Sequence, residues 1–194
     1  MGGILNRTWE ILHDGRFLKK ALMIACPVAL QGMLNTIVNM VDTLMIGGLG
    51  STAIAAVGLA NKVFFVFSLL VCGIVSGGGI LAAQFWGSGD VKNIRKVLGL
   101  CVMLAMVGAL FFVIPAIASP KMVMRIFTTS EGSIELGAKY LRIAALCYPF
   151  IALTNVYVAM LRASNKVVFP VICSCIAIAI NICLNYVLIF GKFG

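Results

Sequence analysis

The chain has 194 residues, of which 62% are hydrophobic and 11% are charged, with a mean hydropathy of +1.10. Soluble domains are nearer half apolar and a quarter charged, so this composition excludes a disordered chain and argues against a soluble domain. The net charge of +9 would indicate a nucleic-acid partner in a soluble protein, but with this apolar excess it indicates the lipid bilayer and no nucleic acid.

Five apolar runs predict five membrane helices, because a backbone in lipid must satisfy its own hydrogen bonds. The runs cover residues 21–46, 53–83, 97–118, 138–161 and 167–190. The polar residues 1–20 precede them as a cytoplasmic segment, and residues 21–194 form a transmembrane bundle. The sequence therefore predicts an all-α, polytopic membrane protein.

Local signals predict where some of these helices begin and end. The second run is too long for one span and contains Lys62, so its first part lies at the interface or its helix is tilted. Before the third run, Ser88–Asp90 predicts a turn and a helix N-cap. Before the fourth run, Thr128 and Glu131 have the spacing of a capping box.

Prolines and glycines inside the runs predict kinks and close packing. Pro27 and Pro149 fall inside the first and fourth runs, where each removes a backbone donor and crowds the preceding turn. Gly73 and Gly77 form a small-xxx-small pair in the second run, which is more typical of tight helix packing than of a functional site.

The distribution of positive charge predicts the orientation. With the N-terminus inside, the cytoplasmic segments hold most of the Lys and Arg residues outside the helices. We therefore expect a multi-pass protein of the plasma membrane with a cytoplasmic N-terminus. Residues 191–194 would then lie outside, and their turn-like sequence suggests a link to a sixth helix and a truncated chain.

One face of the first predicted helix is polar. Its residues are spaced by 4, 4 and 3, which is helical periodicity; they are Gln31, Asn35, Asn39 and Asp42. Asp42 is the only carboxylate within any apolar run. Polar groups exposed to lipid cost several kcal/mol, so this face is expected to point into the bundle.

The fifth predicted helix carries a matching face with Ser174, Asn181 and Asn185. Both helices run outward, so Asp42 and Asn185 should lie at similar depth. Together they would form an oxygen-rich site that holds a proton on the carboxylate or a hard cation such as Na⁺. Alternatively, Asp42 caps a helix end or meets interfacial water, and the asparagines only hydrogen-bond between helices.

Other classes of chemistry have little support. The single histidine, His13, precedes the first apolar run, and no glycine-rich phosphate loop is present. All seven cysteines fall within apolar runs, without a loop framework for disulfides or a ligand set for a metal. We therefore expect no enzyme, no catalytic residue, no metal and no cofactor other than the coupling ion.

Several short segments form a recognisable series along the chain. They are Pro27, Val41–Thr43, Ile46–Gly50, Ala53, Ala55–Asn61, Gly79–Gln84, Gly87–Asp90, Tyr140–Ile143, Leu161–Ser164, Pro170 and Asn181–Gly191. In this order they closely resemble the N-terminal half of MATE (multidrug and toxic compound extrusion) transporters. The resemblance covers nearly all of the chain after about residue 15.

The resemblance implies a twelve-helix antiporter of two six-helix lobes that expels cationic, amphipathic compounds in exchange for Na⁺ or H⁺. This chain would supply five helices of the N-lobe, and the missing C-terminal lobe would be its partner.

The resemblance also implies roles for individual residues. Asp42 matches the family's carboxylate in the N-lobe ion site, Asn181 matches its asparagine, and Pro27 matches the proline associated with gating. Asn39 and Asn185 complete the set of ion-coupling candidates. Some members of the family have aspartate at the position of Asn185, so the asparagine here leaves open whether the coupling ion is Na⁺ or H⁺. The candidates for lining the cavity are Gln31, Asn35 and Tyr157.

Two alternatives remain. A lipid-linked oligosaccharide or polysaccharide flippase of the same superfamily would line its cavity with several basic residues, whereas here only Lys62 and Arg142 approach the membrane interior. A membrane fragment that does not transport would only pair with another chain. The complete reading frame would distinguish an exporter, which continues into further spans, from such a fragment.

Overall fold

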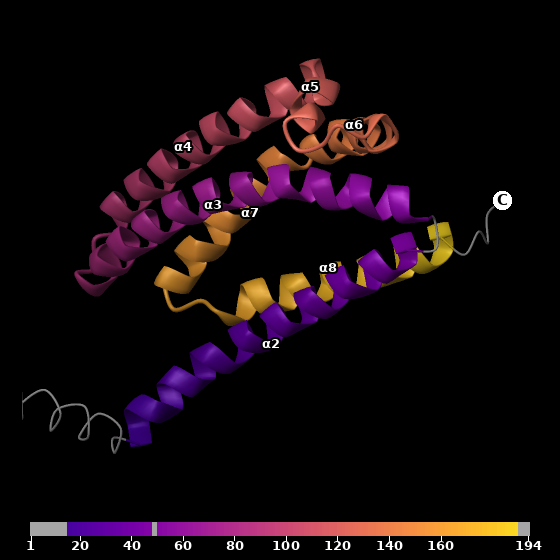
Figure 1. Ribbon diagram of the computed structural model, residues 1–194. Helices are drawn as coiled ribbons and strands as arrows, with labels where there is room; N and C mark the ends of the chain where they lie inside the picture. The colour runs from indigo at the N-terminus through magenta and orange to yellow at the C-terminus, as the bar shows by residue number, and fades with distance from the viewer. Residues whose placement is uncertain (1–14, 48–49, 190–194) are drawn as a thin grey trace, which may run out of the picture. The chain divides into compact units, whose positions relative to one another are not determined.

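The computed structural model describes residues 15–47 and 50–189, and this part of the chain is helical without a strand (Figure 1). The predicted all-α class is confirmed. The helices are α2 (Gly15–Gly47), α3 (Ser51–Gly87), α4 (Val91–Ala118), α5 (Pro120–Arg125), α6 (Glu131–Ala145), α7 (Tyr148–Ala163) and α8 (Val168–Ile189).

The described helices belong to two compact units. Unit 1 comprises Met1–Asp42 and Val167–Gly194, so its described part is α2 up to Asp42 together with α8. Unit 2 comprises Thr43–Lys166 and contains α3 to α7.

Two described helices, α3 and α4, are each long and apolar enough to cross a membrane. The bent pair of α6 and α7 qualifies as one further span. The apolar stretches described within α2 and α8, Val28–Val41 and Val168–Leu184, are shorter than the others. The five-span arrangement therefore stays a prediction.

The helix α3 is continuous over 37 residues, or about 55 Å at 1.5 Å per residue, and passes through Lys62 without a break. This length exceeds the roughly 30 Å hydrocarbon core of a bilayer. Tilting of this helix, one of the two expected arrangements, would accommodate the excess length.

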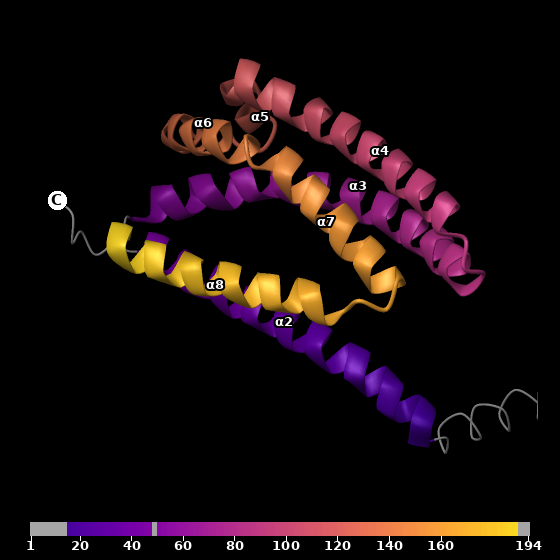
Figure 2. The same cartoon turned by 180° about the vertical axis from the view of Figure 1, so that it is seen from behind.

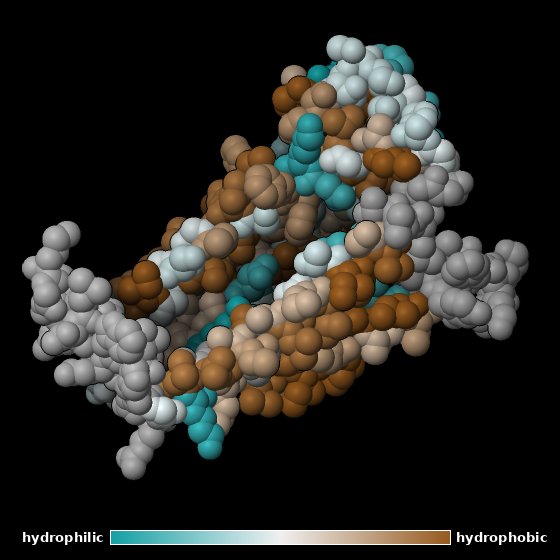
Figure 3. All heavy atoms as spheres, turned by 60° about the horizontal axis from the view of Figure 1, so that its bottom comes forward, coloured by the Kyte–Doolittle hydropathy of each residue, from teal (hydrophilic) through white to brown (hydrophobic). Residues whose placement is uncertain are grey.

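Unit 2 is held together by small and branched side chains at helical spacing. On α3 and α4 the buried positions recur every three or four residues; they are Ala56, Ala60, Val63, Phe67 and Val71, then Val97, Cys101, Ala105, Ala109 and Val113. Small residues let helix backbones approach closely, which compensates for the weak hydrophobic drive between helices in lipid. Large apolar side chains are left on the exposed surface, brown in Figure 3.

An aromatic cluster joins three helices in the centre of unit 2. The ring of Phe67 on α3 stacks on Tyr148 of α7, with centroids 4.7 Å apart and planes 9° from parallel. Phe112 of α4 meets the edge of Phe67 at 5.8 Å, and Phe64 lies 5.7 Å from Tyr148. Stacked and edge-to-face pairs stabilise beyond area burial, so these rings hold α3 against α4 and α7.

The turn between α3 and α4 has the predicted N-cap. Gly89 has a φ of 74°, a left-handed conformation that costs glycine little. The Asp90 side chain accepts a hydrogen bond from the Asn93 backbone N–H at 3.1 Å and another from Asn93 Nδ2 at 2.6 Å. These bonds satisfy an otherwise unpaired donor of the first turn of α4.

The run expected at 138–161 is two helices, α6 and α7, which meet at an angle of 47°. Pro149 lies in the first turn of α7, where its missing N–H costs nothing. The N–H groups of Leu146 and Cys147 bond to carbonyls three residues back, which tightens the end of α6. The kink predicted from Pro149 is therefore confirmed, and it takes the form of a break between two helices.

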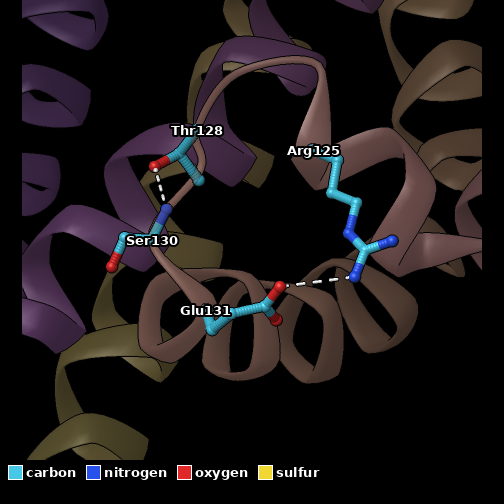
Figure 4. Close-up of polar contacts among 4 residues, drawn as sticks. All are labelled: Arg125, Thr128, Ser130 and Glu131. Carbon is cyan, nitrogen blue, oxygen red and sulfur yellow. Dashed lines mark hydrogen bonds and ion pairs between the residues drawn. The ribbon is translucent and has the colours of Figure 1, made fainter.

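Two local expectations differ from the structure. The capping box is wrong, because α6 begins after Ser130 and Thr128 Oγ1 instead accepts from the Ser130 N–H at 3.2 Å (Figure 4). In the glycine-rich part of α3, no described atom lies within 4 Å of a Cβ built on Gly73 or Gly77. The close packing occurs at Gly78, whose Cβ would meet Cys101 Sγ.

Candidate functional site

The polar residues predicted on the first helix all lie on α2. Gln31 is buried, with an exposed fraction of 9%, whereas Asn35 and Asn39 are exposed within the described part of the chain. The Asp42 side chain lies outside the described residues, although its backbone belongs to α2. The same holds for Pro27, across which α2 is helical, so the predicted bend there stays a prediction.

A hydrogen bond joins the polar faces of α2 and α8 within unit 1. Gln31 Nε2 donates to Ser174 Oγ over 2.5 Å, between residues 143 apart in sequence. The two helices lie side by side in both ribbon views and run in the same direction (Figures 1 and 2). The two predicted polar faces therefore meet at this level of the helices.

This contact fixes the register of the remaining polar positions. Asp42 follows Gln31 by eleven residues, and Asn185 follows Ser174 by eleven, so this pair has the same sequence separation of 143. In parallel helices with a rise of 1.5 Å per residue, both backbone positions lie about 16 Å beyond the contact. Positions 42 and 185 are thus level with each other, while the Asn185 side chain lies outside the described residues.

The same register places two more candidate ion-coupling residues, Asn39 and Asn181, at nearly the same height along the helix axes. Asn39 on α2 corresponds to position 182 of α8, one residue from Asn181, or about 1.5 Å along the axis. Asn181 is exposed in the described part of unit 1. The sequence therefore supplies three amides and one carboxylate within about one helical turn, a donor set of the oxygen type that hard cations prefer.

Tyr157, a candidate for lining the cavity, lies on α7 in unit 2 with 52% of its surface exposed. Gln31 and Asn35 belong to unit 1. The role of these three residues in lining one cavity stays a prediction.

Unit 2 contains a mostly apolar groove, here called the aromatic groove, that the sequence analysis did not predict. Its volume is about 410 Å³, within the 300–1,000 Å³ usual for small-molecule pockets. Asn61 and Phe64 of α3 form one wall, and Tyr140, Ile143 and Tyr148 belong to the helices around the break. Asn61 and Phe64 are three residues apart and therefore lie on one face of α3. This spacing is the feature of the sequence from which one wall of the groove could have been predicted.

The family of the chain follows from comparison with known proteins. The MatE family model matches residues 27–187, which includes the polar faces of α2 and α8. The chain is 30% identical to the probable multidrug resistance protein NorM of Thermotoga maritima, over 91% of this chain and 38% of that protein. It is also 30% identical to the probable multidrug resistance protein YoeA of Bacillus subtilis, over 87% of this chain and 36% of that protein.

A solved structure has the same fold. It is a MOP superfamily transporter from Pyrococcus furiosus, which matches with a TM-score of 0.74 and 22% identity over 90% of this chain and 39% of that one. The chain thus spans less than two fifths of the relatives it matches. The family model covers most of the chain and agrees with the resemblance drawn from the sequence motifs, so the chain belongs to the MatE family of multidrug and toxic compound extrusion proteins.

Proposed function

We propose that this chain is the N-terminal part of a secondary antiporter that exports cationic, amphipathic compounds in exchange for Na⁺ or H⁺. Relatives named as probable multidrug resistance proteins support export of such compounds. Since the chain corresponds to less than two fifths of their length, a C-terminal lobe completes the transporter in this proposal.

The observation that carries the proposal is the Gln31–Ser174 hydrogen bond between α2 and α8. It supports a register in which position 42 is level with position 185 and Asn39 with Asn181. Asp42 then holds a proton or, with the amide oxygens, binds Na⁺. An ionisable residue at membrane depth is costly, and it is typical of proton and ion pathways in transporters.

Coupling in this proposal depends on competition between two states of the protein. The ion binds better in one state and the cationic substrate in the other, because a ligand shifts an equilibrium only by its differential affinity. Arrival of the positive ion at Asp42 then favours release of the positively charged substrate. Bending of α2 at Pro27 is the proposed gating motion, since broken or kinked helices serve alternating access.

The aromatic groove of unit 2 suits the proposed substrate. Phe64, Tyr140 and Tyr148 contribute aromatic surface, and Asn61 contributes an amide. Aromatic faces attract cations and also pack against the flat rings of amphipathic compounds. We assign the groove to substrate binding on this ground.

The proposed location is the plasma membrane, with several spans and the N-terminus in the cytoplasm. The bias of Lys and Arg toward the predicted cytoplasmic segments supports this orientation.

The test uses the protein expressed from its complete reading frame and reconstituted into vesicles. Asp42→Asn retains the shape of the side chain and removes its charge. Ethidium transport is measured under an imposed Na⁺ gradient and, separately, under an imposed pH gradient. We expect gradient-driven transport to fall at least about fivefold, the lower end of typical coupling between two sites, at near-normal expression.

The matched control is Glu135→Gln, the same chemical change at an exposed position of α6 where the carboxylate pairs only with Lys139 at 3.4 Å among the described residues. This variant should transport like the unsubstituted protein. If Asp42→Asn also transports normally with the same ion dependence, the coupling site lies outside α2 and the proposed site is wrong. Transport of a lipid-linked sugar but not of ethidium would instead favour a flippase.

A further inference from the structure

A basic groove lies at the end of α4 within unit 2, and it shares no lining residue with the groove assigned to substrate. Its volume is about 650 Å³. The lining includes one hydroxyl and three cationic side chains, contributed by α4, α5, α6 and their connection; the residues are Ala118, Ser119, Pro120, Lys121, Met122, Arg125 and Arg142.

The positive charge of this groove is only partly compensated. Arg125 Nη2 pairs with Glu131 Oε1 at 3.3 Å, which ties α5 to the start of α6 (Figure 4). The neighbouring carboxylate of Glu135 pairs with Lys139. Within the described residues neither Lys121 nor Arg142 has a carboxylate partner, so the groove retains two positive charges.

An exposed apolar stripe on α4 leads up to this groove. On α4 the exposed side chains Val107, Phe111 and Ile114 form an apolar stripe with 62–72% of each side chain exposed. This stripe ends about one helical turn before Ser119, where the groove begins. Such a stripe is the part of a membrane helix that faces lipid chains.

The short helix α5 combines cations and apolar side chains in the way of an interfacial segment. Met122 and Ile126 are 71% and 76% exposed, and each is adjacent in sequence to one of the cations Lys121 and Arg125. Apolar groups that enter the acyl boundary beside cations that stay at the headgroups are typical of surface-bound amphipathic segments. Unlike a phosphate ion from solution, a lipid would satisfy both kinds of side chain.

We infer that this groove binds the phosphate of an anionic phospholipid, whose acyl chains lie along the apolar stripe of α4. Guanidinium groups match the oxygens of a phosphate with paired hydrogen bonds, which Arg142 and Arg125 can supply. Lys121 adds a point charge and Ser119 a hydroxyl donor. The inference does not depend on the proposed transport function, since it concerns only the lipid-facing corner of unit 2.

The experiment measures lipid preference directly in the protein expressed from its complete reading frame. The protein in neutral detergent is mixed with equal amounts of phosphatidylglycerol and phosphatidylcholine, and the bound species are counted by native mass spectrometry. We expect phosphatidylglycerol to be preferred. Each cation near a membrane surface is worth about a fivefold preference, so Lys121→Gln and Arg142→Gln should each reduce it about fivefold.

Two controls keep the result specific to the groove. Lys139→Gln removes a cation three residues from Arg142 but outside the groove, and it should leave the preference unchanged. Lys121→Arg keeps the charge and should retain most of the preference, which separates loss of charge from loss of folding.

Two outcomes overturn the inference. One is an unchanged preference in the double variant Lys121→Gln, Arg142→Gln. The other is displacement of phosphatidylglycerol by inorganic phosphate at equal concentration, which would mean that the groove binds a soluble anion and that the apolar stripe contributes nothing.

Discussion

The hydrogen bond between Gln31 and Ser174 should contribute measurably to the stability of the α2–α8 pair. Gln31→Leu keeps the side-chain volume and removes the donor, and Ser174→Ala removes the acceptor. Hydrogen bonds between membrane helices contribute about 0.6 kcal/mol on average and up to about 1.7 kcal/mol. We expect the lower value for Gln31→Leu, because the freed serine hydroxyl can bond to the carbonyl four residues earlier in α8.

The pairwise contribution is measured by a double-mutant cycle, which removes effects that the two substitutions do not share. The protein from the complete reading frame is heated in detergent, and its folded fraction is followed by size-exclusion chromatography. A coupling of 0.6–1.7 kcal/mol corresponds to about 1–7 °C in melting temperature for a domain of this size. Thr36→Val is the control partner, since the Thr36 hydroxyl bonds to Gly32 O of its own helix at 3.0 Å.

The control cycle of Thr36→Val with Ser174→Ala should show no coupling. If the cycle of Gln31→Leu with Ser174→Ala also shows none, the two side chains do not hold α2 against α8. The register that brings position 42 level with position 185 would then lose its support.

Further predictions concern packing, gating and orientation. Gly137→Ala should lower stability by about 1–3 kcal/mol, because its Cβ would lie 2.2 Å from Cε of the fully buried Met124; a thermal melt measures this. Gly108→Ala should be nearly neutral in the same melt, because the atom it meets belongs to Leu70, which is 38% exposed and free to move. Pro27→Ala should reduce ethidium efflux with insertion intact, and unchanged efflux would leave this proline a structural role only. Reporter fusions before α2 and after α8 should report cytoplasm and exterior, respectively, and a cytoplasmic signal after α8 would contradict five spans.

Local features were predictable where the signal lies within one short segment. The N-cap at Asp90 depends on residues at most three apart, and the break before α7 lies next to Pro149. The capping box failed for a related reason, because Thr128 has the correct spacing but α6 begins only after Ser130. Sequence spacing predicts that a cap is possible, and the path of the chain decides which residue becomes the cap.

Contacts between distant segments required the structure. Periodicity indicated a polar face on α2 and another on α8, but only the folded pair aligned Gln31 with Ser174 across 143 residues. Likewise, the spacing of Gly73 and Gly77 predicted close packing, which occurs instead at Gly78 because that glycine faces α4. A repeat of 3.6 residues gives the direction of a face, whereas its partner depends on the arrangement of other helices.

The sequence by itself determined the helical class, the family and the residue types available for a polar site, because these depend on composition, periodicity and motifs read along the chain. The tertiary structure alone decided which side chains share a groove. Lys121 and Arg142 are 21 residues apart and meet only because α5 and α6 fold back on the end of α4. The aromatic groove of unit 2 likewise forms only where α3 packs against the break between α6 and α7. A groove is a property of packed surfaces, and residues far apart in sequence come to line it only when the helices that carry them pack together.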